Sequence, residues 1–298
     1  NLNGAALSMG RHKPFVALKE GEKGRFFLPT DLVVGTDGSL FLSDFYNDTS
    51  RVTNQVSGTI YRITRTGAPT LPRPAIDFAT VEGRLAALRS PAVNVRSHAA
   101  TLLIAGGEAV VEPAASALES VASNPVLTAR HLWVLAQLGE AGRARVAPFL
   151  RHDDPQLQIT AYRALRLADP AGVLARAKDL AASPSPAVRR EVAISLRDVP
   201  YADCAEILVP LFAGYDGHDR YYLEALGIAV AGKEEPAYRD LVASKFGQPA
   251  GWTKTAKNLA WRLHTPDAIA ALDACMRAQQ PPVDEFRHLA MAFASFRN

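Results

Sequence analysis

The sequence predicts a mainly α-helical protein, an α-solenoid of stacked helix pairs that is preceded by a small antiparallel β-meander. Two observations indicate this fold class. Alternating apolar and polar residues with a turn signal occupy residues 29–63, and a proline-anchored pattern recurs from about residue 80 onward. The predicted organisation is a β segment at 1–66, a proline-rich linker at 67–79 and a helical region at 80–298 of about seven helix pairs.

The β segment is clearest in PTDLVVGTDGSLFLSDFYN at residues 29–47 and in GTIYRI at 58–63. Asp37-Gly38 separates two apolar runs and signals a hairpin turn, because glycine tolerates positive φ. Polar residues 48–57 form the longer loop before the third strand. Three strands in a meander are marginally stable alone, so we expect neighbours on both faces.

The helical region is organised by a repeat whose anchors are Pro91, Pro125, Pro155 and Pro186, spaced by 34 residues from Pro91 to Pro125 and by 30 from Pro125 to Pro155. Apolar or small residues follow each proline at similar offsets. Less regular copies begin near Asp216, Ala250 and Pro281, with Tyr222, Ala225, Leu226, Trp252, Ala256, Leu259, Val283, Ala290 and Met291 as their predicted core residues.

Physical reasons connect this motif to helix pairs. Proline is accepted in the first turn of a helix, and Asp, Asn or Ser before it caps free amides. Small residues further along allow close approach of the neighbouring helix. A single pair cannot bury its apolar stripe, so the pairs are expected to stack.

Two resemblances follow from these residues. PTDLVVGTDGSLFLSDFYN…SGTIYRIT resembles the last blade of six-bladed β-propellers of the glucose/sorbosone dehydrogenase type, and the proline-anchored pattern resembles short HEAT repeats. Together they are similar to bacterial proteins described as membrane-bound dehydrogenases, which carry a propeller, HEAT-like repeats and commonly a cytochrome c domain. The likeness covers residues 1–66 by motif and the remainder by domain order.

The sequence departs from that family because the earlier blades and any CxxCH haem motif are missing from it. The resemblance therefore implies the scaffold or docking portion of a quinoprotein-dehydrogenase-type protein that is not catalytic alone. Quinone or haem would belong to parts outside this chain. A protein partner, such as the remaining propeller, a cytochrome or another subunit, and a periplasmic or extracellular location are also implied. The alternatives are a free-standing HEAT adaptor with a β cap, or a HEAT-type chromophore lyase or chaperone.

Composition narrows the function classes. The 298 residues carry a formal net charge of only +3, which argues against a nucleic-acid binder, since those concentrate basic charge on one face. No apolar run reaches the approximately 20 residues that span a membrane. Residue 1 is Asn and no signal peptide is visible, so we expect a processed or excised chain. Cys204 and Cys275 are expected to be buried thiols.

Two groups of residues are candidates for binding. Asp31, Asp44, Asn47 and Asp48 surround the predicted strands and have oxygen ligands suited to Ca²⁺, although Asp and Asn commonly make turn hydrogen bonds instead. Arginines at 96, 130, 163 and 189 recur in successive repeats. They either line a groove for an acidic partner or bond to local carboxylates and carbonyls. His98 and His131 also recur, and packing is favoured for them over metal binding.

Overall fold

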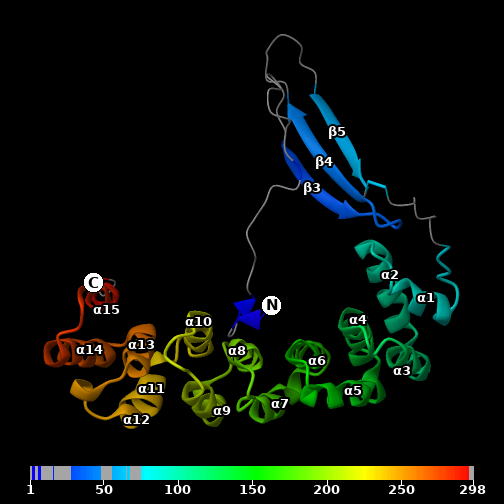
Figure 1. Ribbon diagram of the computed structural model, residues 1–298. Coiled ribbons are helices and arrows are strands. Elements are labelled where there is room, and N and C mark those ends of the chain that lie inside the picture. Colours follow the sequence, from blue (N-terminus) through cyan, green and yellow to red (C-terminus); the bar gives the residue numbers. More distant parts are fainter. Residues whose placement is uncertain are drawn as a thin grey trace. The chain divides into compact units, whose positions relative to one another are not determined.

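The structure is a computed structural model that describes residues 2–3, 6–7, 16, 28–47, 56–64, 66–67 and 75–294. The protein is mainly helical and contains a small three-stranded antiparallel sheet (Figure 1). It divides into two compact units. One is Gly10–Pro148, and the other combines Asn1–Met9 with Phe149–Asn298.

The sheet has the predicted meander order, in which β4 (Leu40–Asn47) pairs with both β3 (Pro29–Val34) and β5 (Val56–Ile63). Gly38 has a φ of 80° in the turn before β4, and the Asp37 carboxylate accepts a hydrogen bond from the Ser39 amide. Arg62 of β5 forms an ion pair with Asp37, so the third strand holds the turn between the first two. The predicted loop at 48–57 lies largely outside the described residues.

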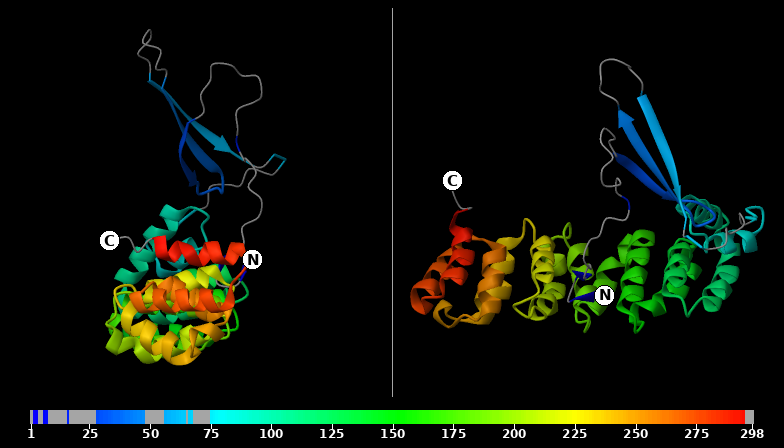
Figure 2. Two further views of the ribbon diagram at one scale, coloured as in Figure 1. Left: turned by 90° about the vertical axis from the view of Figure 1, so that its left-hand side faces the viewer. Right: turned by 45° about the horizontal axis from the view of Figure 1, so that its top comes forward.

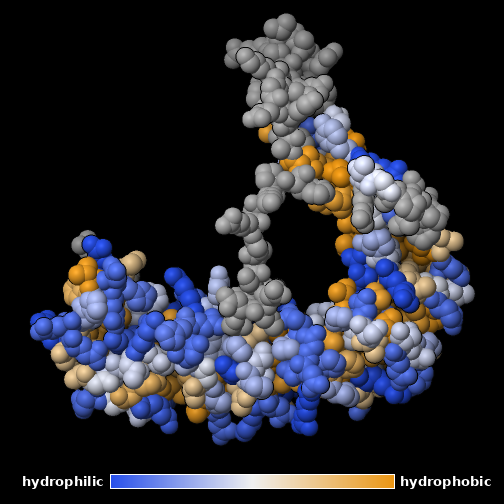
Figure 3. Space-filling model, in the orientation of Figure 1, coloured by the Kyte–Doolittle hydropathy of each residue, from blue (hydrophilic) through white to orange (hydrophobic). Residues whose placement is uncertain are grey.

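The sheet is apolar on both faces. Leu42 lies opposite Leu32 and Tyr61 on one face, and Phe41 lies opposite Val33 on the other, because alternate residues point to opposite sides. Leu42 is buried, yet Leu32 is 54% exposed and Ile60 is 74% exposed. Apolar atoms are visible over these strands in Figure 3. The sheet therefore exposes apolar surface in both directions.

The helices that follow the sheet in its unit stack in two layers, with α2 against α4 in one layer and α1 against α3 and α3 against α5 in the other. Asn124 caps α4 by accepting hydrogen bonds from two amides of its first turn. Pro91, in contrast, lies two residues before its helix. The helices are α1 (Val81–Ala87), α2 (Val93–Ala105), α3 (Val111–Ser120), α4 (Pro125–Ala136) and α5 (Gly139–Val146), with 3-10 turns at Gly107–Val110 and Ala147–Arg151.

The other unit also has two helical layers, visible in the two views of Figure 2. One layer packs α6, α8, α10, α13 and α15 in succession, and the second contains α7, α9 and α11. These helices are α6 (Pro155–Ala168), α7 (Val173–Leu180), α8 (Pro186–Ser195), α9 (Tyr201–Ala213), α10 (Arg220–Ala229), α11 (Glu234–Tyr238), α12 (Ser244–Phe246), α13 (Lys254–Leu263), α14 (Pro266–Gln279) and α15 (Val283–Ala294). Short turns lie at Pro170–Gly172 and Pro249–Gly251, and a π-helical turn lies at Arg239–Ala243. Two-residue strands β1 (Leu2–Asn3) and β2 (Ala6–Leu7) pair with each other.

A continuous apolar core runs through this second unit from Ile159 to Leu289. The predicted core residues Tyr222, Ala225, Leu226, Trp252, Ala256 and Leu259 are all buried in it. The prediction for α15 is wrong, since Val283 and Met291 are mostly exposed and Leu289 is buried instead. Glu285 and His288 of α15 contact Lys257 and Trp261 of α13, so the helix is rotated relative to the register that Pro281 suggested. Both cysteines are buried free thiols.

Candidate functional site

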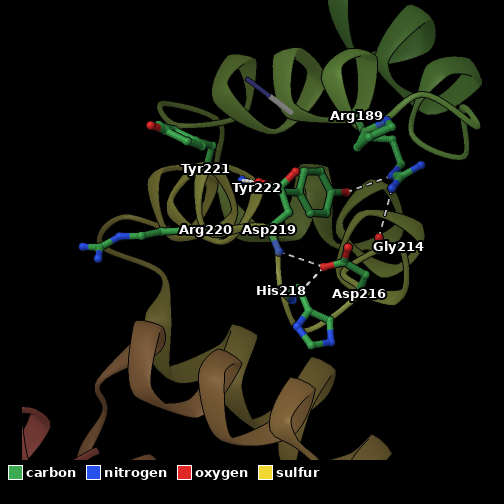
Figure 4. Close-up of a pocket in the computed structure, with 9 residues that line it drawn as sticks. Arg189, Gly214, Asp216, His218, Asp219, Arg220, Tyr221 and Tyr222 are labelled. Atoms are coloured by element: carbon green, nitrogen blue, oxygen red, sulfur yellow. Dashed lines mark hydrogen bonds between the residues drawn. The ribbon is translucent and has the colours of Figure 1, made fainter. Parts of the chain in front are cut away.

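A cavity of about 550 Å³ lies at the amino-terminal ends of α8 and α10 (Figure 4). Its size is within the usual range of ligand pockets, roughly 300–1,000 Å³. It is lined by side chains from these two helices and from the loop that precedes α10, namely Pro186, Arg189, Gly214, Asp216, His218, Asp219, Arg220, Tyr221 and Tyr222.

The cavity wall is formed by a paired arginine and tyrosine. The Arg189 guanidinium lies 5.1 Å from the Tyr222 ring centroid, and its Nε donates to the Tyr222 hydroxyl at 3.2 Å. That hydroxyl donates in turn to the Leu211 carbonyl at 2.8 Å. The other arginine nitrogens donate to the carbonyls of Ser183, at 2.6 Å, and Gly214, at 3.0 Å. Burial raises the pKa of the Tyr222 phenol, which therefore stays protonated and keeps its hydrogen bond to the Leu211 carbonyl.

Gly214 lets the arginine side chain pass directly over its backbone, and a larger residue there would displace the guanidinium. A Cβ atom there would lie 2.7 Å from the Arg189 Nε. A second close approach lies within α10, where a Cβ on Gly227 would lie 2.0 Å from the Arg262 Cζ. These glycines allow long cationic side chains to cross the helix backbone.

The loop before α10 is built from aspartate caps. The Asp216 carboxylate accepts hydrogen bonds from the amides of His218, at 2.7 Å, and Asp219, at 2.9 Å. Asp219 caps α10 by accepting from the Tyr222 amide at 3.0 Å. The amides of Asp219 and His218 lower the pKa of the Asp216 carboxyl, which therefore stays ionised. Gly217, with a φ of 81°, makes the turn possible.

The rim of the cavity is cationic and aromatic. In Figure 4 the side chains of Arg220 and Tyr221 extend away from the aspartates, toward solvent. Tyr221 is 65% exposed. Lys254, at the start of α13, places its Nζ 3.2 Å from the His218 Nδ1. Burial, then the charges of Arg220 and Lys254, lower the pKa of the His288 imidazole on α15.

Two of the predicted arginines occupy equivalent positions. Arg96 of α2 donates to the carbonyls of Ser90, at 2.7 Å, and Pro91, at 2.5 Å. Arg189 of α8 makes the same pair of bonds to Ser183 and Pro184. In both cases the guanidinium closes the loop that enters its helix. The sequence SPxxxVR is shared by the two segments.

The other two predicted arginines lie elsewhere on their helices and make different contacts. Arg130 donates to the Leu88 carbonyl at 2.7 Å, and burial together with the charge of Arg96 lowers the pKa of its guanidinium. Arg163 donates to the buried Glu191 carboxylate at 2.5 Å, which raises the pKa of Arg163. The four arginines therefore do not form one row of equivalent residues. Their binding of an acidic partner stays a prediction.

Sequence reasoning missed Gln158, which replaces the arginine in α6. Its amide nitrogen donates at 2.6 Å to the His152 carbonyl, six residues earlier, as Arg96 and Arg189 do to theirs. Alignment on the helix start, rather than on arginine alone, would have identified this position. The shared feature is a side-chain donor that reaches the preceding loop.

The predicted Ca²⁺ ligands are not brought together where the structure describes them. Asp44 is buried, and its carboxylate accepts a hydrogen bond from the Leu28 amide at 2.7 Å. Asp31 pairs with Ser43, so its side chain points to the opposite face from Asp44. Asn47 ends β4, its side chain is outside the described set, and Asp48 lies outside the described residues. Within the described part, no three His, Cys, Asp or Glu side chains are grouped to hold a metal ion.

The two predicted histidines have separate contacts. His131 is buried in α4, its Nδ1 lies 2.9 Å from the Leu127 carbonyl, and burial lowers its pKa. His98 is exposed on α2 and packs edge-on against Phe78.

Comparison with protein families finds none that matches this chain, and comparison with curated proteins likewise finds no match. None of the helices that the structure describes is long and apolar enough to cross a membrane.

Proposed function

We propose that this chain is the scaffold or docking portion of a secreted propeller–HEAT protein of quinoprotein-dehydrogenase type. In this proposal the strands β3–β5 form a propeller blade and the helices form a HEAT-type solenoid that holds protein partners. The chain does no redox chemistry alone, and any quinone or haem is held with the rest of the assembly. The location is periplasmic or extracellular.

The single observation that supports this function best is the two-faced apolar sheet. Ile60 and Val33 on one face, and Leu32 and Tyr61 on the other, are each more than two-fifths exposed. A blade has a neighbouring blade on each side, and radial repetition is how propellers bury such faces. A single apolar face would instead fit one cap against a helix layer.

The helical layers support the interaction role. Ion pairs join α6 to α8 through Arg163 and Glu191, and α13 to α10 through Arg262 and Glu224 at 2.9 Å. Stacks of this kind present extended surfaces to partners. Apolar Ile194 and Ile228 are more than a third exposed at equivalent positions of α8 and α10.

Site-specific photocrosslinking in the source cells tests the proposal. A photoreactive phenylalanine would replace Ile60 or Tyr61, which lie on opposite faces, and Arg277 on α14 would serve as the matched control. We expect both sheet positions to crosslink to protein that contains further propeller blades, and we expect no crosslink from Arg277. Crosslinks from one face only would favour the free-standing adaptor with a β cap. Crosslinks from neither face would overturn the docking function.

A further inference from the structure

We propose that the outer edge of β5 binds an extended segment of a partner protein, which adds to the sheet as a further strand through main-chain hydrogen bonds. This inference rests on the proposed docking function and names a partner class for it. The photocrosslinks at Ile60 and Tyr61 test the two faces of the sheet, whereas this binding site is an edge. The two proposals can therefore fail separately.

The sheet has two edges because β4 lies between β3 and β5. Among the described residues each outer strand pairs only with β4, so each directs a row of backbone amides and carbonyls away from the ladder. Such a row selects an extended peptide, because another strand satisfies its alternating donors and acceptors. The residues of the two outer strands determine which edge is open.

The edge of β3 is protected against strand addition. Pro29 has no amide hydrogen, and the pairing register shifts between Pro29 and Asp31. The Leu32 amide donates at 2.8 Å to the Asp31 carboxylate, so an acceptor within the same strand already occupies it. A proline, a bulge and a charged side chain are features by which natural sheets prevent edge-to-edge pairing.

The edge of β5 has none of these features. Its eight residues, Val56–Ile63, contain neither a proline nor a carboxylate, and they stay in register with β4 from end to end. Its charged residue, Arg62, is directed to the turn between β3 and β4, where it pairs with Asp37 and donates to the Ser39 hydroxyl at 3.1 Å. Residues 58–62 are all exposed. No side chain of β5 itself therefore closes this edge.

The hydrogen-bond pattern of the sheet identifies the outward amides of β5. On the β3 side of β4, the Gly35 amide donates to the Ser39 carbonyl at 2.8 Å, and the Phe45 amide donates to the Leu28 carbonyl at 3.0 Å. Odd-numbered residues of β4 therefore bond toward β3, and even-numbered residues bond toward β5. The even-numbered residues pair with odd-numbered residues of β5, whose main chain is thus used inward. The outward amides of β5 include those of Gly58, Ile60 and Arg62.

The side chains beside this edge indicate which segment fits it. Ile60 is 74% exposed, and Tyr61, which points to the opposite face, is 43% exposed. An added strand places its own side chains next to them on both faces, where apolar and aromatic neighbours stabilise the pairing. We therefore expect the partner segment to be apolar at successive positions and rich in β-branched and aromatic residues.

A random peptide display library selected on the full chain supplies the probe. A synthetic copy of one selected peptide is then N-methylated on alternate residues, in each of the two possible phases. Strand addition predicts that one phase weakens binding at least ten-fold, because those amides face β5, and that the other phase changes binding little. Equal effects of the two phases would overturn strand addition.

Proline variants identify the edge that is used. Ile60→Pro removes an outward amide of β5 and should weaken the same peptide at least ten-fold, whereas Ile60→Val keeps the amide and should bind nearly as the parent does. Leu32→Pro is the matched control, because it removes an outward amide from the protected edge of β3 and should retain binding. Melting curves establish that each variant is folded.

Amide hydrogen exchange on the unmodified chain gives a second test that needs no variant. The peptide should slow exchange of the Gly58 and Ile60 amides and leave that of Leu32 unchanged. A peptide that binds Ile60→Pro as tightly as the parent, or that protects Leu32 instead, would overturn the edge assignment. A library that yields no binders above the bare support would also overturn it, while the crosslinks from the two faces would still decide the docking function.

Discussion

Ala164 shows how close the helix packing is at a single residue. It lies in α6 and has no exposed surface. It follows the repeat anchor Pro155 by nine residues, an offset at which Ser195 follows Pro186, and the structure places it inside the helix layers. A larger side chain has no space to enter without moving a neighbouring helix.

We predict that Ala164→Arg lowers the free energy of unfolding by about 3–5 kcal/mol, because it overpacks the interface and buries a charge. Thermal and urea unfolding monitored by circular dichroism would measure this. Leu167→Arg, at an exposed position of the same helix, is the matched control and should change stability little. An unchanged melting curve for Ala164→Arg would mean that the repeat register is wrong.

His131 makes stability depend on pH. Burial lowers its pKa below the ordinary value of 6.5, so the unfolded chain binds a proton at a pH where the folded chain does not. The contribution is therefore fully present above about pH 6.5 and is lost as the pH falls through the lower folded pKa. We predict that the free energy of unfolding decreases on acidification from pH 7 and that His131→Leu makes this decrease shallower. Urea titrations at several pH values would measure both slopes, and equal slopes would contradict the assignment.

At the scale of elements, buried Glu191 links two helices of one layer. It lies on α8, is 2% exposed, and accepts from Arg163 of α6, with Arg166 at 3.7 Å. Loss of one partner leaves a buried carboxylate poorly compensated. Arg163 therefore links α6 to α8, independently of any contact with a partner.

The triple variant Arg96→Glu, Arg130→Glu, Arg163→Glu separates a structural role from partner binding. On sequence grounds alone, the fold should survive and association with an acidic partner should slow. The contacts predict that Arg163→Glu alone lowers the free energy of unfolding by about 1–3 kcal/mol, because it removes the partner of the buried Glu191 carboxylate. The loss is no larger because about half of the Arg163 side chain is solvent-exposed and the ion pair is partly screened. Arg163→Gln, which keeps a hydrogen-bond donor, should lose less. A triple variant as stable as the parent would show that the arginines are free to serve a partner.

The sheet is the element whose apolar surface is not buried by its own strands. Leu42 is buried between Leu32 and Tyr61, but these two neighbours are exposed. Three strands bury too little apolar area to be stable alone. The proposal of flanking blades follows from this property.

At the scale of the whole molecule, two compact units imply separable stability. Leu208 of α9 and Leu132 of α4 are both fully buried, one in each unit. We predict that Leu208→Ala costs about 2–5 kcal/mol and speeds amide hydrogen exchange in α8–α10, with a smaller effect on α2–α4. Leu132→Ala should do the reverse. Equal acceleration everywhere in both variants would indicate a single cooperative unit.

The purified chain should show no absorbance from quinone or haem, and no sugar dehydrogenase activity with artificial electron acceptors. The reason is that the sequence contains no CxxCH motif, and in the proposed docking function the cofactor sites belong to other parts of the assembly. A quinoprotein dehydrogenase assayed in parallel is the positive control. Cofactor bound in stoichiometric amount to the isolated chain would contradict the docking function.

The sequence by itself determined the order of elements. Alternation and Asp37-Gly38 specified three antiparallel strands, and prolines 125, 155 and 186 marked helix starts, because turn and cap chemistry are local. Periodicity also identified most core residues that the later repeats bury. It failed for α15, because this helix is oriented on α13 so that Leu289 is buried and Val283 is exposed.

Only the tertiary structure decided which polar side chains meet. Arg163 reaches Glu191 across two helices, and Arg189, Gly214 and Tyr222 form one wall although they come from three segments. Asp31 and Asp44, close in sequence, point to opposite faces of the sheet. Backbone propensities act over a few residues and can be read from the chain, whereas a side chain's partner depends on how helices and strands are oriented in space.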